Sequence, residues 1–298
     1  EVFVAGIMQH IEEAGIHSGD SACCLPPVAI KEKLITEIKN QTKKLALALK
    51  VKGFMNAQYA IKNDEIYIIE VNPRASRTIP FVSKATGVAL ANIAARAMTG
   101  ISLKDQGFIK EVIPKHYSVK ESVFPFNKFL GVDPYLGPEM RSTGEVMGIG
   151  HDFPSACDKA FLAAGDIIPT SGKVFVSLRT LDRERLVELG ARLSNQGFEI
   201  VATRTNQEIL QNAGIECTMV NKVSEGSPHI VDLVKNDEIS LIISSTEDTQ
   251  GLEDAAVIRC QALVHKVPCM TTVSAAFATL DGLKTHDKMI VRSLQSLH

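Results

Sequence analysis

The stretch that decides the fold of the first half of the chain is Ile66-Tyr67-Ile68-Ile69-Glu70-Val71-Asn72-Pro73-Arg74-Ala75-Ser76-Arg77. A second β-rich run, residues 54–61, precedes it, and the turn-forming cluster 62–65 lies between the two. The pattern predicts a β-hairpin that turns at Asn63 and Asp64. Such a hairpin sets Gln58 roughly opposite Glu70.

Side chains alternate between the two faces of a strand, so Gln58, Glu70 and Asn72 are predicted to share one face. A carboxylate and two amide oxygens on one face suit a hard cation such as Mg²⁺, which prefers oxygen ligands and bridges to phosphate. The opposite face is apolar enough to be expected to pack on a core, through Tyr59, Ile61, Tyr67, Ile69 and Val71.

Two arginines follow the hairpin, and the planar guanidiniums of Arg74 and Arg77 offer hydrogen-bond forks for a phosphate or an acyl phosphate. A simpler interpretation remains open for each residue alone, because polar strand residues are usually solvated and Asn-Pro usually ends a strand. The complete run, with Gln58 opposite Glu70, favours the metal–phosphate hypothesis.

The composition excludes several classes of function. The chain has 298 residues, enough for two domains, and a net charge of −2, which indicates neither a nucleic-acid nor a membrane partner. The sequence contains no bilayer-length apolar run and no signal peptide. Six scattered cysteines without CxxC spacing indicate thiols in a reducing compartment, so a cytoplasmic location is expected. The opening at Glu1, directly on an apolar run, is expected to be a cut through a larger polypeptide.

The first 164 residues are predicted to mix strands and helices. We expect a strand within 1–20, a helix after Pro26-Pro27, and two helical pieces over 80–87 and 88–98. Short strands are expected at 109–113 and 116–124, a loop-dominated segment over 127–150, and a helix over 154–164.

From Lys173 onward the pattern changes to an alternation of strands and helices, which predicts a parallel sheet covered on both faces. Expected strands lie near 174–178, 198–202, 217–220, 239–243 and 268–270. Ligands of such sheets bind beyond the carboxyl ends of the strands, where hydroxyls and cations follow several of these runs. An anion site is predicted there, although helix capping explains any one of these residues equally well. The residues concerned include Arg179, Thr203, Lys222, Ser244, Ser245 and Thr246.

Several longer motifs carry a family resemblance, namely 17–21 (HSGDS), 69–77 (IEVNPRASR), 80–87 (PFVSKATG) and 137–148 (GPEMRSTGEVMG). With them, the chain resembles the end of the large chain of carbamoyl-phosphate synthases. The resemblance implies an α/β protein in which a partial ATP-grasp domain with an antiparallel sheet precedes a flavodoxin-like, methylglyoxal-synthase-like parallel domain. The implied boundaries are 1–153 for the first domain, 154–172 for a connecting helix and linker, and 173–298 for the second.

The resemblance also implies roles for individual residues. Gln58 and Glu70 match ligands shared by metal and ATP, Asn72 matches a further metal ligand, and Arg77 and, less directly, Arg74 match catalytic arginines. ATP contacts are also implied for Gly15, Ile16, His17 and Ser18. A phosphorylated effector is implied at Arg183, Thr203, Lys222 and Thr246. Where many members have Thr-x-Gly-Thr, this chain has Thr203-Arg204-Thr205-Asn206, which changes how closely a phosphate can approach.

The implied chemistry is carbamate phosphorylation by ATP, with two Mg²⁺ or Mn²⁺ ions and K⁺ as a further candidate. The implied partners are a glutaminase small chain, the rest of the large chain, and a second copy in a homo-oligomer. Since the family's glycine-rich lid lies upstream, we expect these residues alone to be inactive. Three alternatives stay open: another ATP-grasp ligase, a lyase using Glu247 or Asp248, and a non-catalytic effector-binding module.

Overall fold

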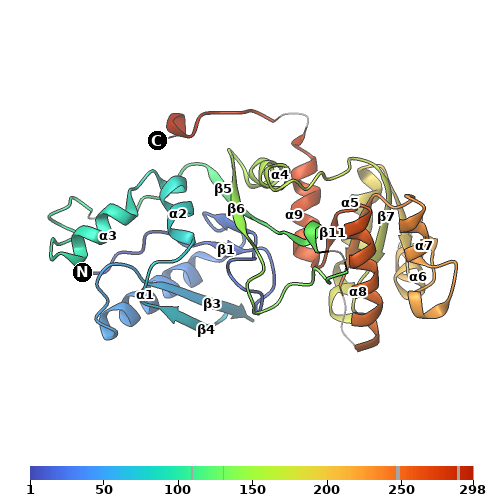
Figure 1. The fold of residues 1–298 in the computed structure, drawn as a ribbon, viewed down its shortest axis with the longest axis horizontal. Helices are drawn as coiled ribbons and strands as arrows, with labels where there is room; N and C mark the ends of the chain where they lie inside the picture. Colours follow the sequence, from blue (N-terminus) through green and yellow to red (C-terminus); the bar gives the residue numbers. More distant parts are fainter. Residues whose placement is uncertain (109, 130, 246–248, 287–288, 298) are drawn as a thin grey trace.

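The computed structural model describes residues 1–108, 110–129, 131–245, 249–286 and 289–297. Within them the strands form a four-stranded sheet, a two-stranded sheet and a five-stranded sheet. Figure 1 shows the first two in the N-terminal half and the third in the C-terminal half, with helices α4 (Phe153–Ala164) and α9 (Val273–Leu283) between them.

The four-stranded sheet is antiparallel and has the order β1-β2-β5-β6. Its strands are β1 (Gln9–His10), β2 (Cys23–Leu25), β5 (Tyr117–Val123) and β6 (Gly144–Gly150). Helix α4 packs on this sheet and begins at Asp152, whose Oδ1 accepts a hydrogen bond from Ser155 N at 2.9 Å. A Cβ at Gly148 would lie 2.1 Å from the carbonyl oxygen of Ala156, so this glycine permits the close approach of the helix.

The strand expected within 1–20 is present as β1, and the apolar run 2–7 lies outside it. Two other expectations for this half were wrong. No strand lies at 110–113. Residues 144–150, expected to be a loop, form β6 along the whole length of β5. Glycines weaken strand propensity in a sequence pattern, but here Gly148 is needed for helix packing rather than for a turn.

The predicted hairpin is present as β3 (Asn56–Lys62) and β4 (Glu65–Asn72). Asn63 and Asp64 form its turn with φ angles of 53° and 64°, the left-handed values that such a two-residue turn requires. The expectation that its apolar face packs on a core was wrong in part, since Tyr67 and Ile69 remain 49% and 47% exposed.

Three helices accompany the hairpin: α1 (Glu32–Ala48), α2 (Thr78–Thr86) and α3 (Leu90–Met98). Helix α1 buries Leu34 and Ile38, which lie four residues apart on one face. Phe81 and Val82 of α2 form a separate small core with Leu90 at the start of α3. These elements place the hairpin beside the segment 3–10 near the N-terminus.

The C-terminal half has the predicted parallel sheet, in the order β11-β10-β7-β8-β9. Its strands are β7 (Gly172–Ser177), β8 (Phe198–Ala202), β9 (Thr218–Met219), β10 (Leu241–Ser244) and β11 (Cys269–Met270). The main helices are α5 (Leu186–Asn195), α6 (Arg204–Asn212), α7 (Ile230–Lys235), α8 (Thr249–Val264) and α9. Short 3₁₀ turns of this half are η2 (Thr180–Arg185), η3 (Val223–Glu225) and η5 (Leu294–Leu297), and η1 (Phe126–Lys128) belongs to the first half.

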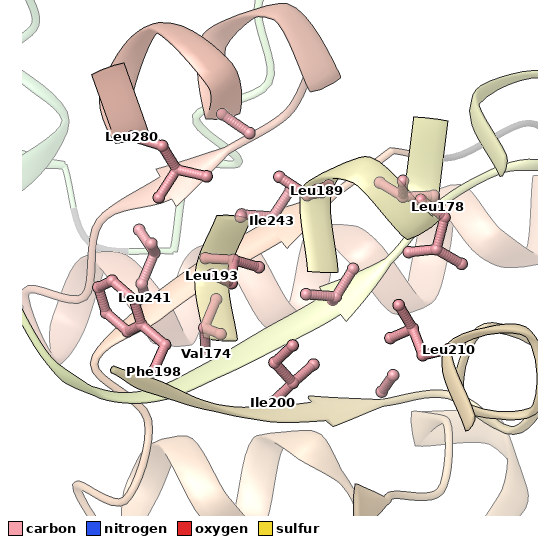
Figure 2. Close-up of a cluster of buried hydrophobic side chains, with 14 of the residues drawn as sticks. Val174, Leu178, Leu189, Leu193, Phe198, Ile200, Leu210, Leu241, Ile243 and Leu280 are labelled. Atoms are coloured by element: carbon pink, nitrogen blue, oxygen red, sulfur yellow. The ribbon is translucent and has the colours of Figure 1, made fainter. Parts of the chain in front are cut away.

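Strand alternation gives this sheet two separate cores. Val174 and Val176 of β7 point to one face, where they meet residues of α5 such as Leu189, while Phe175 points to the other face. Figure 2 shows the first of these cores, with Leu193 and Leu280 among its members. The second core lies under α7 and α8.

The two halves meet where α4 packs against α9. Ala278 of α9 belongs to the same buried cluster as Ala156 and Ala160 of α4. Asp158 of α4 lies 3.0 Å from His286 Nδ1, just beyond α9. Among the described residues, no helix is long and apolar enough to cross a membrane.

Candidate functional site

The structure pairs Gln58 with Glu70 across the hairpin. The register shifts between Gln58 and Tyr59, because Tyr59 pairs with Ile68, and this β-bulge brings Glu70 rather than Ile69 opposite Gln58. Asn72 Nδ2 donates a hydrogen bond to Glu70 Oε1 at 2.9 Å, which places the two side chains on the same face of β4. Asn72 is itself opposite Asn56. The hairpin therefore carries a carboxylate flanked by carboxamides on one face.

This donor set fits a hard divalent cation. The Asn72 amide nitrogen is turned to Glu70, so its oxygen and the second carboxylate oxygen of Glu70 remain available as ligands. In the part of the chain that the structure describes, no group of three or more His, Cys, Asp or Glu side chains could hold a metal ion. The hairpin instead offers oxygen atoms of one carboxylate and two carboxamides, a donor set that suits a cation whose remaining ligands are phosphate oxygens.

A cleft of about 520 Å³ lies beside the hairpin. Its walls come from the segment 3–10, from α1 and from β3, and Gln58 and Ser18 are both among its lining residues. These two residues belong to the predicted metal and nucleotide sets respectively. The cleft thus brings one member of each predicted set to a common cavity of ligand size.

The segment Gly15–Ser18, predicted to line the nucleotide, is held by backbone contacts. Gly15 has a φ of 108°, a left-handed conformation that favours glycine. His17 N donates to the carbonyl oxygen of Gly137 at 2.8 Å, and His17 Nδ1 accepts a hydrogen bond from Gly19 N at 3.0 Å. The imidazole therefore stabilises the turn of its own segment.

The two arginines differ in their surroundings. Arg77 Nη1 donates to Ser142 Oγ at 3.3 Å, and Ser142 Oγ in turn donates to the carbonyl oxygen of Gly19 at 3.1 Å. Arg77 is thereby linked to the end of the nucleotide segment. Arg74 Nη1 donates to the neighbouring Ala75 carbonyl oxygen at 3.0 Å, a contact within its own loop.

A group of buried charges below this segment was not found from the sequence. Lys120 is 1% exposed, and its Nζ lies 3.3 Å from the carbonyl oxygen of Ser18. Asp20, also 1% exposed, accepts hydrogen bonds from the backbone N–H groups of Arg141 and Ser142 at 2.8 and 2.9 Å. The one available signal was the charged pair Lys120-Glu121 inside a run with strand pattern.

Burial sets the protonation of the groups around Lys120. Loss of hydration raises the pKa of both Glu12 and Glu121, and their mutual repulsion adds to the shift of Glu121. Burial, assisted by the nearby charge of Lys120, lowers the pKa of His10 to about 4. The imidazole is therefore neutral at physiological pH, and the positive charge of this region is carried by Lys120.

At the carboxyl edge of the parallel sheet, the predicted anion residues are joined by hydrogen bonds. Thr203 is 5% exposed, and its hydroxyl lies 3.4 Å from Ser177 Oγ. Asn206, which stands where many relatives of the resembled family have threonine, is 2% exposed, and its Oδ1 accepts from Leu178 N at 3.2 Å. Arg183 Nε donates to the Leu178 carbonyl oxygen at 3.3 Å.

Lys222 lies at the start of η3, where its backbone N–H donates to Glu225 Oε2 at 2.9 Å. Its side chain is exposed at the same end of the sheet as the other cations. Thr246 lies outside the described residues, as do Glu247 and Asp248, the candidate bases of the lyase alternative. Of the predicted effector set, the described residues Arg183, Thr203 and Lys222 therefore lie at the carboxyl edge of the parallel sheet.

Comparisons with known proteins match two separate parts of the chain. Residues 2–106 match the sequence profile "Carbamoyl-phosphate synthase L chain, ATP binding domain", and residues 185–271 match the MGS-like domain. Over 298 aligned residues the chain is 52% identical to the carbamoyl phosphate synthase large chain of Pseudomonas putida. The chain belongs to the carbamoyl phosphate synthase large-chain family.

Other large chains of this family show a similar likeness, with 54% identity in Pseudomonas syringae and 52% in Vibrio cholerae. Each alignment covers 100% of this chain and 28% of the relative. The chain thus spans little more than a quarter of the length of these carbamoyl phosphate synthase large chains. Among solved structures, a methylglyoxal synthase from Elizabethkingia anophelis matches 40% of this chain and 82% of its own, at 15% identity and a TM-score of 0.33.

The family profiles contain most of the predicted site residues. The ATP-binding profile spans the segment Gly15–Ser18 and the hairpin with Glu70, and it extends past Arg77. The MGS-like profile includes Thr203 and Lys222 and begins after Arg183. The predicted fold class is confirmed. The ATP-binding match contains the hairpin and strands β1 and β2 of the antiparallel sheet, and the MGS-like match contains strands β8 to β11 of the parallel sheet.

Proposed function

We propose that the complete protein to which this chain belongs is a glutamine-dependent carbamoyl phosphate synthase, and that the first half of this chain takes part in phosphorylating carbamate. The proposed reaction converts ATP and carbamate into ADP and carbamoyl phosphate. The observation that carries the proposal is the 52% identity along the whole chain to a carbamoyl phosphate synthase large chain. The oxygen-rich face of the hairpin supports it.

Gln58, Glu70 and Asn72 are the residues that would hold Mg²⁺ or Mn²⁺ with the nucleotide. A bound divalent cation neutralises phosphate charge and orients the transferred group. The hairpin orients these side chains, because the register that pairs Gln58 with Glu70 keeps all three on one face. Their rigid placement on strands rather than on a loop limits the movement of the ligand set.

In the transfer step, a carbamate oxygen attacks the terminal phosphorus of ATP, and the bond to the ADP oxygen breaks. Negative charge on the transferring phosphoryl group is then spread over its outer oxygens. We assign to Arg77 the role of stabilising this charge, because its hydrogen bond to Ser142 links it to the nucleotide segment. Arg74 is proposed to support it from the same loop.

We assign to the second half an effector-binding role rather than chemistry of its own. The buried hydroxyl of Thr203, the partly buried cation Arg183 and the exposed cation Lys222 at the carboxyl edge of its sheet suit a small phosphorylated molecule. A thermal-shift screen of the complete protein with nucleoside monophosphates and with ornithine tests this part. A ligand that binds the folded state raises the melting temperature.

The test of the phosphorylation step uses the complete protein with glutamine, bicarbonate and ATP. Glu70→Gln should lower carbamoyl phosphate formation at least about a hundredfold, as expected when charge stabilisation in the transition state is lost. The reverse reaction, ATP formation from ADP and carbamoyl phosphate, should fall in parallel. The matched control is Glu65→Gln on the same strand, which leaves the proposed ligands intact. Turnover of the Glu70→Gln protein close to that of the control would refute the assignment.

A second test concerns the 298 residues by themselves, which we propose to be inactive because they correspond to 28% of the large chain. Calorimetric titration with ATP and Mg²⁺ should show no tight binding. Binding in the low-micromolar range, near −8 kcal/mol on the usual scale of about 1.4 kcal/mol per tenfold, would contradict this proposal. From the family relationship we also propose three partners of this chain. They are the glutaminase small chain, the rest of the large chain and a second copy in a homo-oligomer.

A further inference from the structure

One arginine joins the effector edge of the second half to the nucleotide segment of the first. Arg179 follows β7, and its Nη2 forms an ion pair with Glu13 Oε1. Its Nε lies 2.8 Å from Asp182 Oδ2 in η2. A single guanidinium is therefore shared between an acid of each half.

Both ends of this link belong to the candidate sites. Glu13 lies two residues before Gly15, and its carbonyl oxygen accepts a hydrogen bond from Ile16 N at 3.4 Å, so its backbone is part of the turn that begins the nucleotide segment. At the other end, the backbone N–H of Arg179 donates to Ser245 Oγ at 3.2 Å. Ser245 directly follows β10 at the carboxyl edge of the sheet.

The two acids hold Arg179 unequally. The side chain of Asp182 is 17% exposed, and its Oδ2 also accepts a hydrogen bond from Ser245 Oγ at 2.7 Å. The side chain of Glu13 is 52% exposed. An exposed carboxylate is easily rehydrated when it loses its partner, so Glu13 is the acid that an incoming anion can displace from Arg179.

We propose that Arg179 is a coupling switch between the two halves of the chain. An anionic ligand at the carboxyl edge of the parallel sheet draws the guanidinium toward that edge, breaks the ion pair with Glu13 and loosens the segment Gly15–Ser18. This inference rests on the anion-binding role proposed above. The switch has two arrangements of one side chain, and only the arrangement with the Glu13 ion pair connects Arg179 to the nucleotide segment.

The charges at this edge favour the exchange. Arg179 is paired with two carboxylates, those of Glu13 and Asp182, while Arg183 and Lys222 supply further positive charge at the same edge. A phosphate group that arrives there gains a third cation if Arg179 turns to it. The lost ion pair with Glu13 is worth little at an exposed position, so we expect a change of about two- to fivefold in the local opening of residues 13–18.

Hydrogen exchange of the complete protein tests the switch, because one measurement reports both sites. Inorganic phosphate is the probe, and chloride at equal ionic strength controls for screening of the exposed ion pair. Phosphate should slow exchange at 177–183 and 203–206, and it should speed exchange at 13–18 about two- to fivefold. Glu13→Gln should show fast exchange at 13–18 from the start, with no further change on addition of phosphate. The matched control is Glu184→Gln, an exposed acid on η2, which should behave as the unmodified protein.

Two results would overturn the inference while leaving the effector site in place. One is slowed exchange at the sheet edge without any change at 13–18. The other is an equal phosphate response at 13–18 in the Glu13→Gln protein. If phosphate changes nothing at the sheet edge, the proposed effector site itself is wrong, and the switch fails with it.

Discussion

The ion pair between Asp133 and Arg259 should stabilise the contact between the two halves, and its removal has a calculable effect. Arg259 Nε and Nη2 lie 2.7 and 2.6 Å from the two carboxylate oxygens of Asp133. The side chain of Arg259 is 5% exposed and that of Asp133 is 34% exposed. Burial alone would raise the pKa of Asp133, but the hydrogen bonds and charge of Arg259 hold that pKa below its ordinary value.

Each hydrogen bond to a charged group contributes roughly 1.5 to 3 kcal/mol when its partner is removed, and the partial exposure of Asp133 reduces that figure. We therefore expect Asp133→Asn to lower the free energy of unfolding by about 2 to 3 kcal/mol, because it leaves a buried guanidinium without its counter-charge. Arg259→Gln should cost less at the pair itself, since the carboxylate of Asp133 can rehydrate. The guanidinium also lies 4.8 Å from the ring of Tyr135, a contact worth about 0.5 to 1 kcal/mol.

A double-mutant cycle measured by equilibrium urea denaturation separates the pair from these other losses. The coupling energy of Asp133→Asn with Arg259→Gln should be about 1.5 to 2 kcal/mol. The control is Asp237→Asn, whose side chain is 79% exposed, and it should change stability by less than about 0.5 kcal/mol. A coupling energy below about 0.5 kcal/mol would show that the pair does not stabilise the contact, and the reasoning from burial would then be refuted.

Three further predictions concern stability. Gly148→Ala should lower the free energy of unfolding by about 1 to 3 kcal/mol, because the added Cβ would overlap the backbone of α4. In the same urea assay Gly144→Ala should have little effect, since the space around Gly144 is open. Asp152→Ala should cost about 1 kcal/mol through loss of the N-cap of α4, measured as a fall in the urea midpoint that Asp152→Ser largely restores. The His10 imidazole, followed by NMR, should stay neutral until about pH 4. In the unfolded chain the same imidazole has its ordinary pKa of 6.5, so its contribution to stability should be complete above pH 6.5 and lost as the pH falls toward 4. His10→Gln should abolish this part of the pH dependence of stability.

The elements that the sequence predicted well are those with strong local patterns. Asn63 and Asp64 tolerate the left-handed conformation that a tight turn needs, so the hairpin and the register next to its turn followed from neighbouring residues. The register shift between Gln58 and Tyr59 did not. The alternation after Lys173 predicted a parallel sheet because buried strands and amphipathic helices each have a recognisable period. The order of the strands is visible only in the structure.

Elements whose conformation depends on distant partners were predicted poorly. Strand β6 contains three glycines, Gly144, Gly148 and Gly150, and its pattern is that of a loop until β5 and α4 are placed beside it. The run 2–7 has a strand pattern but joins no strand. The exposure of Tyr67 and Ile69 likewise depends on what covers the hairpin rather than on the hairpin itself.

The sequence alone determined the hairpin, the side chains with oxygen atoms on one of its faces and the succession of an antiparallel and a parallel part, because turns and periodic patterns act over a few residues. Tertiary structure alone decided which charges are buried and which are paired. Lys120 reaches the carbonyl oxygen of Ser18 from 102 residues away, and Arg179 reaches Glu13 from 166 residues away. Such contacts have no local signature, since partners so far apart in the sequence meet only in the folded chain.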